Sequence, residues 1–345
     1  MTDDLLFYVI IPIYNGARYI DQCIESIYRQ TYSNYRIVMV NDGSVDDSAS
    51  ICDQYAQRDS RVTVLHQENK GQLASRDAAV RYLIKQNIDA EHTYLLFLDV
   101  DDQLKTEALS EIRNAIISYN CDMVFFGYER VKEGKILKKY SPEKYFSGCI
   151  EDKRILYKII LSDNNYNSMC TKSMSLKLYS DVDYSNYYRV RHGEDLIQSL
   201  SYLRNCKKAY FLNKALYNYT VNASSVSQKV NYKNYELDSA VREYVWQFLR
   251  DENVWTESDF EDYVLFCQKL LMRKIKAVAC FDIPGNERKR MLEIMHGNAY
   301  YQQILSKGAD KNIVLQLFNK KKYMTLCFLI RLLYKPVDIA KRIRN

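Results

Sequence analysis

The stretch LLFLDVDDQL, Leu95–Leu104, places three carboxylates directly after four large apolar residues. The apolar run is typical of a strand that is buried on both faces. Such a strand has no structural need to end in Asp99, Asp101 and Asp102, so the charge predicts a positive partner at this point. Alternating carboxylates at a strand end can converge on one hard cation such as Mg²⁺ or Mn²⁺. The bland alternative is a solvated loop that caps the next helix.

The first 130 residues alternate strand patterns with helix patterns. Strands are predicted over 7–14, 35–42, 61–66, 93–99 and 122–128. Helices are predicted over 17–29, 46–55, 72–84 and 106–117, with Asp46 and Asp47 in the first turn of the second helix. This alternation is typical of an α/β, Rossmann-like fold, a mainly parallel sheet with helices on both faces.

The rest of the chain has a different pattern. Residues 131–230 are irregular, with weak strand signals and one clear helix start at HGEDLIQSLSYL, 192–203. From 231 onward the pattern is helical, with helices predicted over 235–250, 259–280 and 287–304. The expected domains are therefore 1–230, in two halves of about 1–130 and 131–230, and a helical C-terminal region, 231–345.

Composition indicates an ordinary globular protein, with 47% hydrophobic and 27% charged residues. The 9 cysteines form no CxxC pair and the 4 histidines have no metal-ligand spacing, which favours reduced thiols in a cytoplasmic protein over a zinc site. The start, MTDDLLFYVIIPIYN, is acidic where a signal peptide would be basic. No run of about 20 apolar residues predicts a membrane span.

Every candidate motif of the first half follows a predicted strand, where parallel sheets bind ligands. The motifs are PIYNG (12–16), NDGSVDDS (41–48), QENKGQLASRDA (67–78) and DVDD (99–102). Tyr14 offers a ring on which a base could stack, Asp42 could accept hydrogen bonds from a base or ribose, and Arg76 could reach a phosphate or base carbonyl. Each also has a purely structural interpretation, as a half-buried tyrosine, a capped turn or a surface arginine.

A second acidic motif, RHGEDLIQSL (191–200), opens a predicted helix. Asp195 would lie in its first turn, where the helix dipole favours the ionised carboxylate and makes it a candidate general base. Glu194 and His192 compete for that role, and an ordinary acidic first turn is the alternative. No GxGxxG follows the first strand and no GxxxxGK[ST] occurs, which disfavours dinucleotide oxidoreductases and P-loop enzymes.

Taken together, these motifs resemble the family 2 glycosyltransferases of the GT-A fold, of the bacterial polysaccharide and glycoprotein type. The resemblance covers about residues 5–230 and rests on the order of VIIPIYNGARYI, VNDGSVDDS, NKGQLASRDAAV, LFLDVDD and GEDL. It departs from the family pattern at Asp77, Val100 and Thr220, and SMCTKSMSLKLY (168–179) retains Lys172 without the usual Trp.

The resemblance implies a metal-dependent, mostly inverting transferase of the hexosyltransferase type. It would move a sugar from a nucleotide diphosphate sugar to a glycan, glycolipid or glycoprotein. The expected donor is a UDP-sugar. Pro12 and Tyr14 would line the base and ribose pocket, and Asp42 would bind the uracil edge with Arg76 nearby. Asp99 would hold the ribose or the metal, Asp101 would ligate Mn²⁺ or Mg²⁺, and Asp195 would deprotonate the acceptor, in each case as the family pattern implies.

The tail 320–345 carries eight Lys or Arg and one acid, so it sums to +7 and the rest of the chain to −1. A basic amphipathic tail can lie on an anionic leaflet, which would place the protein peripherally on the inner face of the cell membrane. The alternatives are a tail docked on the body and a helical region that forms a homo-oligomer. The neutral body disfavours nucleic-acid binding.

Two other functions remain alternatives. One is a member of the fold that binds a nucleotide sugar or a partner without turnover. The other is a nucleotidyltransferase, which PIYNG disfavours because such enzymes need a Gly-rich, basic loop after the first strand.

Overall fold

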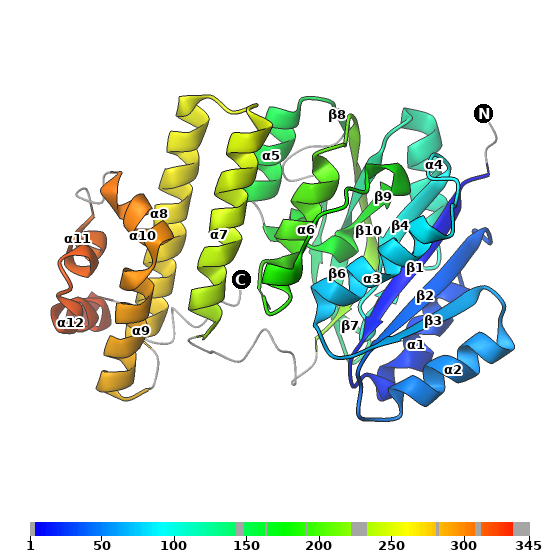
Figure 1. Cartoon of the computed structure of the whole chain (residues 1–345), viewed down its shortest axis with the longest axis horizontal. Coiled ribbons are helices and arrows are strands. Elements are labelled where there is room, and N and C mark those ends of the chain that lie inside the picture. Colours follow the sequence, from blue (N-terminus) through cyan, green and yellow to red (C-terminus); the bar gives the residue numbers. More distant parts are fainter. Residues whose placement is uncertain are drawn as a thin grey trace. The chain divides into compact units, whose positions relative to one another are not determined.

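The structure is a computed structural model that describes residues 4–142, 148–162, 164–190, 192–221, 233–280, 283–307 and 312–333. The chain separates into two compact units, Met1–Lys229 and Val230–Asn345. The first is built around a sheet and the second consists of helices (Figure 1).

In the described part of the first unit, ten strands form one mixed sheet in the order β3-β2-β1-β4-β9-β6-β10-β5, with β7 beside β6 and β8 beside β10. The strands are β1 Leu6–Ile13, β2 Tyr35–Asp42, β3 Val62–Gln67, β4 Thr93–Phe97, β5 Gln103–Leu104, β6 Met123–Lys132, β7 Lys135–Tyr140, β8 Gly148–Ile150, β9 Lys172–Ser175 and β10 Ala209–Thr220. The apolar runs of β1, β2 and β4 are buried almost throughout, as strands with helices on both faces require.

Most of the strands run in one direction. β1 pairs in parallel with β2 and β4, β2 with β3, and β6 with β10. β9 is antiparallel to both β4 and β6, so it joins the two parallel parts and leaves β6 running the same way as β4. The carboxyl ends of β1, β2, β3, β4, β6 and β10 therefore lie along one edge of the sheet.

Six helices accompany this sheet in the described ranges of the unit. They are α1 Ala17–Tyr28, α2 Ser48–Arg58, α3 Gln72–Lys85, α4 Ala108–Tyr119, α5 Lys153–Ser162 and α6 Glu194–Leu203. The predicted apolar face of α1 is buried at Ile20, Cys23, Ile24 and Ile27. The second helix begins two residues later than predicted, because Asp46 bonds to the backbone N–H groups of Ala17 and Ser48 instead of entering the helix.

The middle of the chain contains more sheet than its sequence predicted. β9 is only four residues long, and its sequence, KSMS, has no alternation of apolar and polar residues. β10 is twelve residues long, but register shifts between Leu212, Ala215 and Tyr217 interrupt its period of two. Both strands derive their stability from neighbours distant in sequence, so local pattern gave only a weak signal.

The loops after β1 and β2 are joined at the carboxyl edge. The backbone N–H of Asn15 donates to Ser44 Oγ at 3.0 Å, and Gly16 N–H donates to Ser48 Oγ at 2.9 Å. Gly43 has a φ of +68°, and a Cβ atom there would meet the backbone nitrogen of Asn69 at 2.7 Å. Gly43 is thus required both by its left-handed backbone and by the close approach of the loop after β3.

We expect Gly43→Ala to lower the free energy of unfolding by about 3 kcal/mol, through backbone strain plus the clash with Asn69. Gly134→Ala is the matched control, because Gly134 has a φ of +74° and nothing within 4 Å of an added Cβ. That control should cost about 1 kcal/mol. Urea unfolding of both variants measures the difference, and equal losses would show that the loop yields at Asn69.

The second unit contains α7 Lys233–Glu252, α8 Glu257–Cys280, α9 Gly285–Gly297, α10 Ala299–Ser306, α11 Ile313–Asn319 and α12 Tyr323–Leu333. One helix was predicted over 287–304, but Asn298 divides it. Its backbone is extended and its side chain accepts a hydrogen bond from Tyr301 N–H, which starts α10 afresh. Trp246, Trp255, Phe260 and Tyr263 form an aromatic core for α7 and α8.

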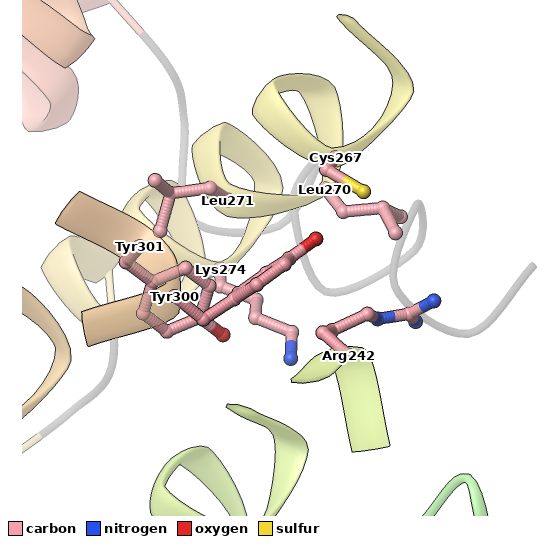
Figure 2. A pocket seen from close by; sticks show the side chains of 7 residues that line it. All are labelled: Arg242, Cys267, Leu270, Leu271, Lys274, Tyr300 and Tyr301. Carbon is pink, nitrogen blue, oxygen red and sulfur yellow. The ribbon is translucent and has the colours of Figure 1, made fainter. Parts of the chain in front are cut away.

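A small pocket lies among α7, α8 and α10 (Figure 2). Its free space of about 10 Å³ accommodates about one water molecule. It is lined by Arg242, Cys267, Leu270, Leu271, Lys274, Tyr300 and Tyr301. A sugar nucleotide does not fit there, whereas the predicted motifs lie at the carboxyl edge of the sheet in the first unit.

Candidate active site

The acidic stretch after β4 lies at the carboxyl edge, as the sequence predicted. Asp102 is buried, and its carboxylate accepts hydrogen bonds from Tyr217 Oη at 2.6 Å and Thr220 N–H at 2.7 Å, both on β10. Burial, with the negative charges of Asp99 and Asp101, raises the pKa of Asp102 well above its usual range. Asp102 thus anchors the turn to β10, while Asp99 and Asp101 remain partly exposed.

Arg76 supplies positive charge to the acidic stretch from within the chain, in addition to the cation that the sequence predicted there. Its guanidinium is 1% exposed, donates from Nη2 to Asp99 at 3.1 Å and pairs through Nη1 with Asp195. The two carboxylates belong to different motifs, 23 and 119 residues from Arg76 in the chain. A planar guanidinium has donors in a fixed fork, so it can hold two acids in one geometry.

Partial burial raises the pKa of Asp99, and the charges of Asp195 and Asp101 raise it further against the opposing effect of Arg76. Gln72 at the start of α3 also donates to Asp99, at 2.5 Å. The cluster therefore holds more negative than positive charge, and an added cation would relieve it.

The second acidic motif lies at the start of α6, as predicted. Gly193 has a φ of +96° and precedes the helix, so that Glu194 and Asp195 occupy its first turn. Asp195 Oδ2 accepts a hydrogen bond from Met169 N–H at 3.3 Å. Burial, then the neighbouring charge of Asp195, raises the pKa of Glu194 to about 7. His192 is exposed in the preceding turn.

Lys172, at the start of β9, supports the turn that contacts Asp195. Its ammonium group has no exposed surface and donates to the carbonyl oxygens of Asn167 at 3.1 Å and Ser168 at 2.6 Å, and to Ser199 Oγ on α6 at 2.8 Å. Burial lowers its pKa to about 7. The next residues of that turn are Met169, which bonds to Asp195, and Cys170, whose Sγ lies 3.9 Å from Arg76.

Asp42 at the end of β2 is also buried. Its carboxylate accepts hydrogen bonds from Gln67 Nε2 at 2.7 Å and from the backbone N–H groups of Lys70 at 2.9 Å and Gly71 at 2.8 Å. These bonds fix the loop before α3 and so the start of the helix that presents Gln72 and Arg76. Pro12 is buried in β1, whereas Tyr14 is 53% exposed after it.

The structure thus brings together Arg76, Asp99, Asp101 and Asp195. Asp42, Pro12 and Tyr14 lie at the ends of neighbouring strands of the same edge. Sequence reasoning did not identify Gln72 and Tyr217, which position the acidic stretch, or the internal role of Lys172. The retained Lys172 was the one signal for the last of these.

The oxygen donors of this edge fit a hard divalent cation. The described residues hold no cluster of three or more His, Cys, Asp or Glu arranged to bind a metal. Mg²⁺ and Mn²⁺ commonly need only one or two carboxylates when substrate phosphates supply the other oxygens. Asp101 with Asp99 satisfies that smaller requirement.

Comparison with known proteins places these motifs in a family. Residues 8–181 match the family model of glycosyl transferase family 2. Glycosyltransferase GlyA of Streptococcus pneumoniae serotype 4 is 28% identical over 235 residues, which cover 66% of this chain and 32% of GlyA. The matched region is thus about a third of that relative's length.

Solved structures agree on the fold. S. aureus TarS 1–349, in complex with UDP-GlcNAc, has a TM-score of 0.70 at 18% identity, covering 95% of this chain and 91% of that chain. GalNAc-T7 with UDP, GalNAc and Mn²⁺ has a TM-score of 0.50 at 14% identity, covering 76% and 55% of the two chains. At these identities the comparisons establish a shared GT-A fold. The likeness to TarS extends over the helical unit as well.

Proposed function

The chain belongs to glycosyl transferase family 2, and on that premise we propose that it moves a sugar from a nucleotide diphosphate sugar, most simply a UDP-sugar, to an acceptor hydroxyl. The acceptor would be a glycan, glycolipid or glycoprotein. The observation that carries this proposal is the fork of Arg76, which holds the acid of the DVDD motif and the acid of the GED motif in one site. The structure of TarS in complex with UDP-GlcNAc supports the choice of a UDP-sugar.

The donor would lie across the carboxyl edge of β1, β2 and β4. The exposed ring of Tyr14 and the strand end at Pro12 supply an aromatic and apolar surface for the base. Asp42 shapes the loop beside it, and its lone pairs not used by Gln67, Lys70 and Gly71 could accept from the uracil edge. Residues 1–130 would thus bind the nucleotide sugar and 131–230 the acceptor.

Asp195 would be the general base. The α6 N-terminus stabilises its carboxylate, and Arg76 and Met169 N–H fix its orientation. It would take the proton of the acceptor hydroxyl as the acceptor oxygen bonds to the anomeric carbon and the bond from that carbon to the diphosphate breaks. Attack from the face opposite the diphosphate would invert the anomeric centre. Glu194, with its pKa of about 7, is the competing base.

A divalent cation at Asp101 and Asp99 would neutralise the diphosphate and make it a better leaving group. The chain's own contribution is to hold Asp99 through Arg76 and Gln72 and to fix the turn through Asp102. That arrangement leaves the partly exposed Asp101 at the edge where the diphosphate would lie.

Thermal unfolding with a panel of nucleotide sugars, with and without Mn²⁺, tests this proposal. A ligand that binds only the folded chain, at 100 times its Kd, stabilises it by about 2.7 kcal/mol. We expect one UDP-sugar to raise the Tm only when Mn²⁺ is present. In the Asp101→Asn variant this Mn²⁺-dependent rise in Tm should be lost. No shift with any nucleotide, with or without metal, would contradict donor binding. A shift without any release of UDP would indicate a member that binds but does not turn over.

A further inference from the structure

Helix α12 has apolar side chains on two opposite faces. Tyr323, Leu326, Cys327 and Ile330 are buried, and the helix packs against α8 and α11. Met324, Phe328 and Leu332 follow one another at intervals of four residues, so they share the other face. Their exposed fractions are 70%, 70% and 71%, and Leu333 at the helix end is 63% exposed. These four residues are called the α12 stripe below.

Positive charge lies beside the α12 stripe. Lys320, Lys321 and Lys322 come directly before the helix and are all exposed. No acidic residue occurs in the sequence between 311 and 337, so nothing in this segment balances them. The further basic residues predicted to act with them, Lys335, Lys341, Arg342 and Arg344, lie outside the described residues.

The length of the helix limits what can cover the α12 stripe. Eleven residues extend about 16 Å along a helix axis, about half of the hydrocarbon thickness of a bilayer. None of the helices that the structure describes has the length and apolar character to cross a membrane. An apolar stripe bordered by lysines instead matches a helix that lies in the plane of a bilayer surface.

Charge favours a lipid surface over a second copy of the chain as the binding partner of the α12 stripe. A second copy of the stripe would bring no acidic residue of this segment to balance the lysines, because none occurs between 311 and 337. An anionic lipid surface attracts the same lysines and accepts the apolar side chains among its acyl chains. We propose that the α12 stripe, with Lys320–Lys322, binds the surface of an anionic lipid bilayer.

Sedimentation of the full chain with vesicles tests the proposal. Vesicles of phosphatidylcholine alone should bind little of the chain. Vesicles in which about a third of the lipid is phosphatidylglycerol should bind about tenfold more, and most of that binding should be lost at high salt. Met324→Ser with Phe328→Ser and Leu332→Ser should abolish binding. Lys320→Gln with Lys321→Gln and Lys322→Gln should lower it by about tenfold or more.

Two controls keep the result interpretable. Ile136→Ser with Leu137→Ser removes apolar side chains that are 60% and 57% exposed on β7, and it should leave vesicle binding unchanged. The Tm of each variant reports whether the fold survives, and exposed positions should change it little. Equal binding by wild type and the triple serine variant would overturn the proposal. So would absent vesicle binding, or a dimer in solution that the serine variant alone disrupts.

Discussion

Asp195→Asn is expected to lower the rate of sugar transfer by about a thousandfold, within the range that loss of a general base produces. The amide keeps the shape of the carboxylate, its one oxygen can still accept from Met169 N–H or from Arg76, and the proposed base-binding positions Tyr14 and Asp42 are unchanged. Donor binding should therefore persist, with a Kd within about threefold of wild type. UDP release from the donor identified by thermal unfolding measures the rate. Transfer at the wild-type rate would remove Asp195 from the role of base.

Glu194→Gln is the matched control for that experiment, because Glu194 occupies the same helical turn. We expect transfer to persist in this variant if Asp195 is the base. The raised pKa of Glu194, about 7 against 4.5, means that the folded chain retains a proton there that the unfolded chain loses first. Its contribution to stability is present below pH 4.5 and lost as the pH rises to about 7. Stability of the variant should lose this part of the pH dependence.

Arg76→Met is expected to lower the free energy of unfolding by about 3 kcal/mol near pH 7.5. The substitution removes the buried positive charge and leaves the carboxylates of Asp99 and Asp195 without it. The lost guanidinium is 1% exposed and balances both Asp99 and Asp195. Transfer should fall with it, since Asp195 loses the group that orients its carboxylate. Arg76→Lys retains the charge without the fork, so it should recover stability more than activity.

The pH dependence of this variant supplies a second readout. Without Arg76, the already raised pKa of Asp99 rises further. A carboxyl group of this kind stabilises the fold below its unfolded pKa, and the effect is lost as the pH rises through the folded value. The deficit of Arg76→Met should therefore shrink toward pH 4. Urea unfolding at both pH values measures it, with the exposed Arg36→Met as control. A loss no larger than that of Arg36→Met would contradict the ionic role of Arg76.

The sequence predicted the part of the fold that local pattern controls. The apolar runs of β1, β2 and β4 and the amphipathic face of α1 are continuous in sequence, and the structure confirms them closely. The motifs at the carboxyl ends follow from that parallel arrangement. Parallel strands carry their ends to one edge, so the shared position of DVDD and NDGS required no knowledge of contacts.

The remainder depended on contacts between distant residues. Arg76 was predicted to lie near the nucleotide, but its burial between Asp99 and Asp195 requires the position of α6 to be known. Lys172 matches the family pattern, but the sequence alone did not show where its side chain lies. Its burial follows from the position of β9 between β4 and β6, which directs the ammonium group into the protein. Such pairings have no period that a local pattern could reveal.

A crystal structure of the full chain grown with UDP and Mn²⁺, with the metal located by its anomalous scattering, would show directly where the nucleotide and the cation bind. We predict a Mn²⁺ peak beside Asp101 and Asp99, bridged by diphosphate oxygens, with the uracil at the strand ends near Tyr14 and Asp42. Nucleotide bound away from this edge, or bound here with no metal signal at Asp101, would contradict the proposed site.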